Sequence, residues 1–127
     1  EQLTNAALFH GNAWLLVPLL FGPSSIAQVF VNFPDPWWKE RHKKRLVLNQ
    51  LFLGALKTRM KPDGFILVQT DVAELFDHYQ ALLTANGFMV DDALQPDIIM
   101  AQTKAQTHRE KKCLLQGLPI YRGVFRI

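Results

Sequence analysis

The sequence predicts an α/β fold built on an open sheet with flanking helices. Short apolar runs rich in Val, Ile and Phe alternate with stretches whose apolar residues recur at helical spacing. The resulting order of strand, helix, strand and helix implies parallel pairing through crossover connections. A chain of 127 residues, 49% of them hydrophobic, has room for one core, so we expect one domain over residues 1–127.

The predicted elements begin with a short buried strand over 6–9 and a turn over 10–12. A helix is then expected to begin near Ala13. Residues 26–33 are typical of a central strand covered on both faces, because nearly all of them are apolar. Pro34 should end this strand, since proline cannot donate to the strand ladder.

The second part of the chain continues the alternation. Its predicted elements are a helix over 46–60, a turn over 61–64, a strand over 65–68, a helix over 72–86 that is capped by Gly87, a short strand over 88–90 and a final strand over 118–127. Residues 91–106 have only a weak pattern. No internal repeat or low-complexity segment is present.

Polar residues follow each of the first three predicted strands. Gly11 and Asn12 come after the first, Asp35 after the second, and Thr70 and Asp71 after the third. Ligands of open α/β sheets bind beyond the carboxyl ends of the strands, so we expect these residues to form one site.

Asp35 lies between two prolines. Each proline fixes its own backbone and favours an extended conformation of the residue before it, here Phe33 and Asp35. The carboxylate should therefore be held stiffly, as a ligand-binding group must be. An isolated Asp-Pro pair more often only caps a turn. The tryptophans and cations that follow favour the binding role.

A dense basic run follows this turn. Five of the fourteen Lys and Arg residues fall within seven positions, although the formal net charge is only +3: Lys39, Arg41, Lys43, Lys44 and Arg45. Such a run is commonly a solvated face or a helix start. Beside a pocket at a strand end, it instead predicts a cradle for phosphates, with His42 as a further donor or stacking ring. Of Trp37 and Trp38, at most one should be deeply buried, which leaves the other to shape a pocket wall. Nucleic acid is the partner that this composition favours.

Other features limit the choice of compartment and class. The single cysteine, Cys113, cannot form an internal disulfide, which favours a reducing compartment, and it is expected to be a buried apolar filler. The longest apolar run, 13–21, contains Pro18 and is too short to span a membrane. The chain begins with Glu1 and without a secretion signal, so it has the character of a piece of a longer protein. No metal site is predicted.

These residues carry a family resemblance. Residues 32–45, Asn-Phe-Pro-Asp-Pro-Trp-Trp-Lys-Glu-Arg-His-Lys-Lys-Arg, closely resemble the signature of the bacterial tRNA (guanine-N(7)-)-methyltransferases. The resemblance continues through 61–64, 70–71 and 107–110 with Gly117, in the same order and approximate spacing. It implies a class I, Rossmann-like fold that uses S-adenosyl-L-methionine to methylate a guanosine in the tRNA variable loop, in the cytoplasm.

The resemblance also implies roles for single residues. Asp35 is similar to the active-site carboxylate, and both Asn12 and Asp35 are assigned to cofactor binding. Thr107 to Glu110 resembles a substrate-binding loop, although Thr107 and Glu110 also have the spacing of a helix capping box. With the basic run, the expected substrate-binding residues are Lys39, Arg41, His42, Lys43, Arg45, Asp71, Thr107, His108, Arg109 and Glu110.

One part of the family pattern is absent from this sequence. The glycine-rich cofactor turn needs closely spaced glycines, yet the nearest pair here, Gly117 and Gly123, lies six residues apart. We therefore expect the amino-terminal cofactor-loop half of the fold to be missing and residues 1–127 to be a partial methyltransferase domain. A non-catalytic RNA-binding module is the alternative function. A weaker alternative is an amino-methyltransferase that acts on protein or DNA. The sheet edge exposed by such a truncation could pair with a second copy of the chain.

Overall fold

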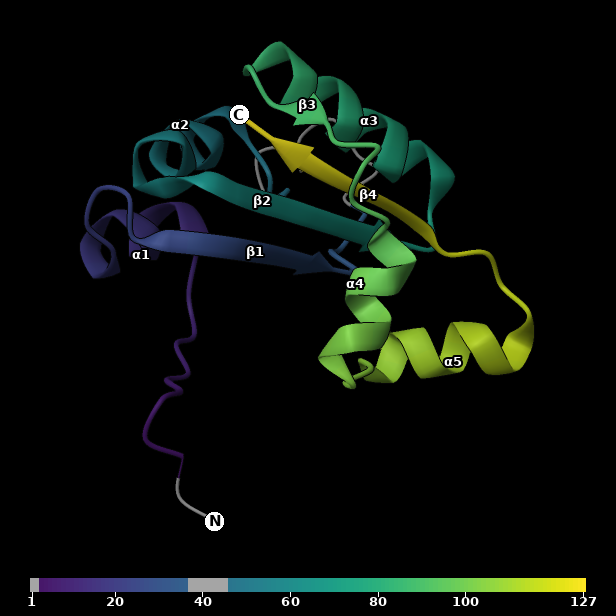
Figure 1. Cartoon of the computed structure of the whole chain (residues 1–127). Helices are drawn as coiled ribbons and strands as arrows, with labels where there is room; N and C mark the ends of the chain where they lie inside the picture. Colours follow the sequence, from purple (N-terminus) through teal and green to yellow (C-terminus); the bar gives the residue numbers. More distant parts are fainter. Residues whose placement is uncertain (1–2, 37–45) are drawn as a thin grey trace.

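A mixed four-stranded sheet organises the part of the chain that the computed structural model describes, residues 3–36 and 46–127 (Figure 1). The helices are α1 (Ala13–Leu20), α2 (Gln50–Arg59), α3 (Ala73–Ala85), α4 (Pro96–Thr103) and α5 (His108–Gln116). The strands are β1 (Ile26–Asn32), β2 (Met60–Thr70), β3 (Met89–Val90) and β4 (Tyr121–Arg126). None of the described helices is both long enough and apolar enough to cross a membrane. The α/β prediction is confirmed.

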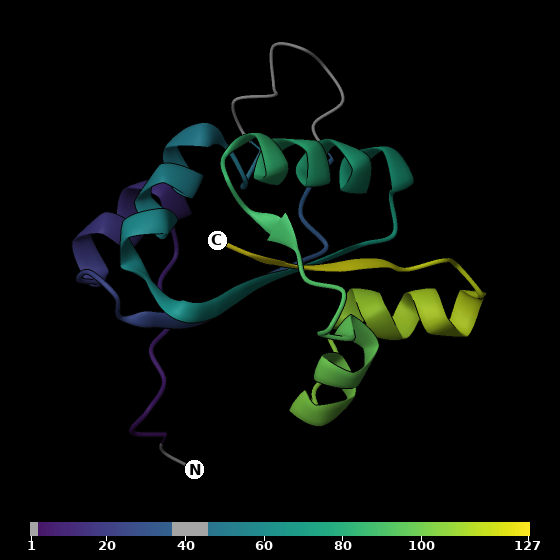
Figure 2. The same ribbon diagram turned by 45° about the horizontal axis from the view of Figure 1, so that its top comes forward.

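The strand order is β1-β2-β4-β3, with β1 and β2 parallel and β4 antiparallel to both β2 and β3. The carboxyl ends of β1 and β2 therefore lie together at one end of the strands, on the right in Figure 1. Helix α3 covers one face, and α4 and α5 lie on the other (Figure 2).

The core alternates along β2, the most buried strand. Ile66 and Val68 pack into the cluster that contains residues of α2 and α3, whereas Phe65 and Leu67 face the cluster that contains Met100 of α4. This two-residue period is the expected pattern of a strand covered on both faces. Cys113 is fully buried, as predicted.

A strand does form within residues 26–33, but the prediction that it is central and covered on both faces is wrong. β1 forms an edge of the described sheet, and Val31 is its single buried residue. The predicted strand over 6–9 is also wrong. These residues are exposed and form no strand, with Leu8 98% exposed. A four-residue apolar run forms a stable strand only where a neighbouring strand pairs with it, and none pairs with 6–9 among the described residues.

The predicted turn over 61–64 lies inside β2. Ile26 is opposite Met60 and Gln28 is opposite Phe65, so residues 61–64 all lie opposite Ala27 and form a bulge. Gly64 permits this close approach, because a Cβ there would come within 2.8 Å of the Ala27 carbonyl oxygen. Turn-forming residues thus distort the strand here and do not end it.

We predict that Gly64→Ala destabilises the fold by about 2 kcal/mol, because the obstructing atom belongs to the backbone and cannot rotate away. Gly54→Ala is the matched control. Gly54 lies exposed within α2 with nothing within 4 Å of an added Cβ, so alanine there should stabilise by about 0.5–1 kcal/mol. Urea unfolding of both variants gives the comparison. A loss at Gly54 as large as that at Gly64 would contradict this explanation.

The helices differ from the sequence predictions mainly at their ends. α2 begins later than residue 46 because Asn49 caps it, its Oδ1 accepting a hydrogen bond from the Phe52 amide at 2.9 Å. α3 agrees with the prediction, and Gly87 has the positive φ of +85° expected of a residue that ends a helix. α4 was not predicted, although Pro96 at its first position is a helix-start signal.

Candidate functional site

The chain turns abruptly between β1 and Asp35. Phe33 has a φ of +47°, so the prediction that Pro34 holds it extended is wrong. Its amide donates to the Gln69 carbonyl at 2.8 Å, and this bond to β2 holds the left-handed conformation. A non-glycine residue with positive φ is strained, and such strain clusters at functional sites. Asp35 follows this turn and is exposed.

A cavity of about 430 Å³ lies beside Asp35. Its walls include Val29, Phe33 and Phe52, together with Ala13 at the start of α1. Asn12 precedes Ala13, and its side chain makes no capping hydrogen bond to the helix. Of the two predicted cofactor residues, Asp35 therefore lines the cavity, whereas Asn12 only adjoins its lining residue Ala13.

Tyr79 of α3 is buried in the same core cluster as Phe52, which lines this cavity. Burial raises the pKa of Tyr79 to about 12, the backbone amides of Leu48 and Val47 oppose this rise, and the charge of Asp35 adds to it. The hydroxyl makes no hydrogen bond of normal geometry with the described residues. Tyr79 stays neutral at physiological pH and adds no charge beside Asp35.

Asp71, directly after β2, forms an ion pair with Arg109 of α5. The sequence predicted both as substrate contacts, and the structure brings them together. The hydrogen bond from Arg109 lowers the pKa of Asp71 below its ordinary value of 3.8, and burial acts in the opposite direction. The pair fastens the start of α5 to the carboxyl end of β2.

The pKa shift of Asp71 predicts how the stability of the chain depends on pH. A carboxylate whose folded pKa is lowered stabilises the fold above its unfolded value of 3.8, and this stabilisation is lost as the pH falls through the folded value. Asp71→Asn should therefore lower the melting temperature by a few degrees at pH 7, and this difference should shrink below pH 3.8. Arg109 is 41% exposed, so the effect should be small and sensitive to salt. A difference that stays constant down to pH 2 would exclude the pair as its source.

Thr107 caps α5, its Oγ1 accepting from the Glu110 amide at 3.1 Å. Half of the predicted capping box is thus confirmed. The other half would need the Glu110 carboxylate to turn back to Thr107, but this carboxylate instead accepts from Arg122 of β4 at 2.6 Å. His108, the first residue of α5, is exposed.

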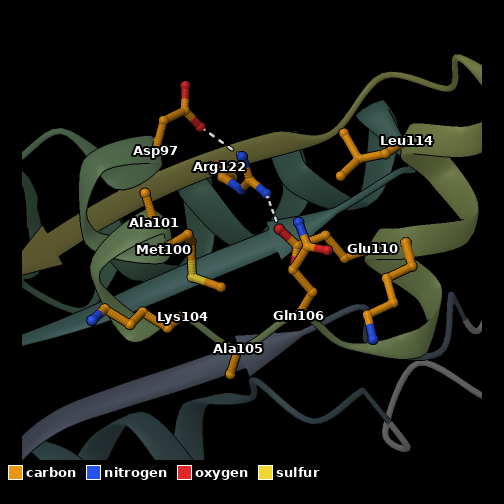
Figure 3. A pocket seen from close by; sticks show the side chains of 10 residues that line it. Asp97, Met100, Ala101, Lys104, Ala105, Gln106, Glu110, Leu114 and Arg122 are labelled. Carbon is orange, nitrogen blue, oxygen red and sulfur yellow. Dashed lines mark hydrogen bonds and ion pairs between the residues drawn. The ribbon is translucent and has the colours of Figure 1, made fainter.

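A second cavity, of about 450 Å³, lies between α4, α5 and β4 (Figure 3). Arg122 lies at its wall between two carboxylates, Asp97 and Glu110. Sequence reasoning missed Arg122 and its partner Gln69. Gln69 follows an apolar run and Arg122 is one of two arginines on β4, a pattern that a solvated face also explains.

Part of the predicted site lies outside the described residues. This part comprises Trp37, Trp38, Lys39, Arg41, His42, Lys43, Lys44 and Arg45. The phosphate cradle therefore stays a prediction. Asp35, Asp71 and the segment 107–110 are described, and Asp35 and Asp71 follow the carboxyl ends of neighbouring parallel strands, as expected.

Comparison with known proteins gives consistent matches along the chain. The family model described as "Putative methyltransferase" matches residues 1–123. A tRNA (guanine-N(7)-)-methyltransferase of Alkaliphilus metalliredigens is 42% identical over 127 residues, covering 98% of this chain and 58% of that protein. Proteins of the same name from Latilactobacillus sakei and Myxococcus xanthus are 36% and 32% identical, each covering 95% of this chain and 57% and 59% of their own lengths. The chain thus spans less than two thirds of these relatives.

Proposed function

This chain belongs to the methyltransferase family whose model it matches, and from that premise we propose that it forms part of a tRNA (guanine-N(7)-)-methyltransferase. The proposed reaction transfers a methyl group from S-adenosylmethionine to nitrogen 7 of a guanosine in the tRNA variable loop, in the cytoplasm. The position of Asp35 carries the proposal. It is an exposed carboxylate beside a cavity, at the carboxyl ends of β1 and β2, where Asp71 also lies.

The cavity beside Asp35 suits part of S-adenosylmethionine. Its volume of about 430 Å³ lies within the usual range of small-molecule sites. Val29 and Phe52 offer apolar walls, and the Asp35 carboxylate suits a cationic group. Asn12 and Asp35 would hold the cofactor, which supplies an electrophilic methyl group when bound. The sequence contains no glycine-rich turn, so these residues would form one wall of the complete site.

Nitrogen 7 of guanine carries an in-plane lone pair, so methyl transfer to it needs no prior removal of a proton. The residues of the chain must therefore chiefly orient the base and stabilise the positive charge that develops on it. Asp35 would stabilise this charge or accept a hydrogen bond from an N–H edge of the purine. Asp71 and Glu110 would orient the base or ribose, and the basic run over 39–45 would contact phosphates.

A methyl-transfer assay tests the proposal. The full-length enzyme that contains this chain is incubated with S-adenosylmethionine labelled in its methyl group and an unmodified tRNA transcript, and N7-methylguanosine is located by chemical cleavage of the RNA at that nucleotide. We expect one labelled guanosine, in the variable loop. Label at another atom or another region of the tRNA would contradict the proposed specificity.

The second candidate, a non-catalytic RNA-binding module, is favoured by the missing glycine-rich turn and by the part of its relatives that the chain spans. Isothermal titration with S-adenosylmethionine separates the two functions. Heat of binding with a defined stoichiometry supports the methyltransferase. Tight tRNA binding without any uptake of S-adenosylmethionine would favour the module.

A further inference from the structure

A row of three polar side chains crosses the sheet on the face covered by α4 and α5. Asn32 of β1 is directly opposite Gln69 of β2, which is directly opposite Arg122 of β4. The Gln69 amide nitrogen donates to Asn32 Oδ1 at 2.9 Å, and Arg122 Nε donates to Gln69 Oε1 at 2.9 Å. Arg122 can only donate, so it fixes which end of the fully buried Gln69 amide faces each neighbour.

Arg122 extends this row to two carboxylates, which differ in burial. Its Nη1 donates to Asp97 Oδ1 at 2.7 Å and its Nη2 to Glu110 Oε1 at 2.6 Å (Figure 3). The Asp97 side chain is 82% exposed, so that contact should contribute little. The Glu110 side chain is only 4% exposed. A buried carboxylate depends strongly on its cation, since removal of one partner leaves an uncompensated charge.

Glu110 uses only one of its two carboxylate oxygens in this contact. Its Oε2 is buried and makes no hydrogen bond with the described residues. A buried acceptor without a partner is costly and rare, and its cost is explained if a ligand supplies the missing donor. Glu110 also borders the second cavity.

We propose that Arg122 is a positioning residue for substrate binding. It holds one oxygen of Glu110 so that the other faces the hydrogen-bond donors of the RNA. Through its hydrogen bond to Gln69, Arg122 also fixes the position of Glu110 relative to Asn32, which lies three residues before Asp35. The row thereby ties the α5 segment of the site to the β1 end of the site. This inference rests on the proposed function, because it takes RNA as the ligand of Glu110.

The alternative is that Arg122 only stabilises the fold, and a matched variant separates the two roles. Arg126 lies on the same strand and forms an ion pair with Asp91 at 2.8 Å, away from Glu110. Arg122→Gln and Arg126→Gln remove the same charge from the same strand. Arg122→Lys keeps the charge but replaces the fork, whose separate nitrogens contact Gln69 and Glu110, by a single nitrogen, so it should not restore full binding.

The test measures the affinity of each variant for an unmodified tRNA transcript, with melting temperatures alongside. We expect Arg122→Gln to weaken binding about tenfold and Arg122→Lys to weaken it less, while Arg126→Gln stays within about twofold. If Arg122 acts through Glu110, Arg122→Gln should add less than about twofold to the effect of Glu110→Gln.

Two results would overturn the role of Arg122: equal tRNA affinity of the Arg122→Gln and Arg126→Gln variants, or fully additive effects of Arg122→Gln and Glu110→Gln. Should Arg122→Gln fail to fold, Arg122→Lys provides the same comparison. Absence of tRNA binding by the unsubstituted chain is a different result. It would overturn the proposed function, and this inference with it.

Discussion

Asp35→Asn should reduce methyl transfer to tRNA by about 100-fold or more while tRNA affinity stays within about twofold. Asparagine keeps the size of the side chain and removes the charge, so the loss would report the electrostatic stabilisation of the developing purine cation. Because Asp35 is exposed after β1, the substitution should not disturb the core. The rate is measured with both tRNA and S-adenosylmethionine at saturating concentrations, so that weaker binding of either substrate cannot imitate a change in the chemical step.

Asp63→Asn is the control for this substitution. Asp63 is also an exposed aspartate, but it lies in the bulge near the amino end of β2, away from the carboxyl ends of the strands. We expect its rate to be unchanged. Isothermal titration of Asp35→Asn with S-adenosylmethionine gives a second result that does not depend on turnover, namely weaker binding of the cationic cofactor. Normal turnover by Asp35→Asn would remove Asp35 from the mechanism.

The elements that could be predicted are those whose signal is local. The strand predicted over 26–33 and the helix predicted over 72–86 each have a local signal, and the structure confirms both elements as β1 and α3, although β1 lies at the edge of the described sheet. Asp35 and Asp71 could be placed at one edge, because parallel neighbouring strands bring their carboxyl ends together whatever the details of packing. The cap at Thr107 also follows from local spacing.

The features that could not be predicted depend on residues distant in the sequence. Arg122 is 53 residues from Gln69, and only the antiparallel register of β4 with β2 brings them opposite each other. Likewise, the left-handed backbone of Phe33 is held by a bond to Gln69 of the next strand, which outweighs the local preference imposed by Pro34. The Glu110 carboxylate leaves the predicted capping box because Arg122 of β4, a charged donor, is a stronger partner than a backbone amide.

Neutralising Lys43, Lys44 and Arg45 together should weaken tRNA binding by about 10- to 100-fold at low salt and flatten its dependence on salt. Each cation that neutralises a phosphate releases a counterion, so the slope of log affinity against log salt should fall by roughly 0.7–0.9 for each phosphate that is no longer neutralised. Replacement by glutamine keeps polar side chains of comparable length. Affinities measured across a series of salt concentrations give the slope.

The double variant Lys57→Gln with Lys61→Gln is the control for general charge. Lys57 and Lys61 are exposed and lie at the end of α2 and the start of β2, at the opposite end of β2 from Asp71. If net charge alone drives binding, each cation removed there should change the slope as much as each one removed from the basic run. If 43–45 contact the RNA backbone, the control should leave the slope nearly unchanged, because its cations lie outside the binding face. An unaltered slope in the triple variant would exclude the basic run as the phosphate cradle.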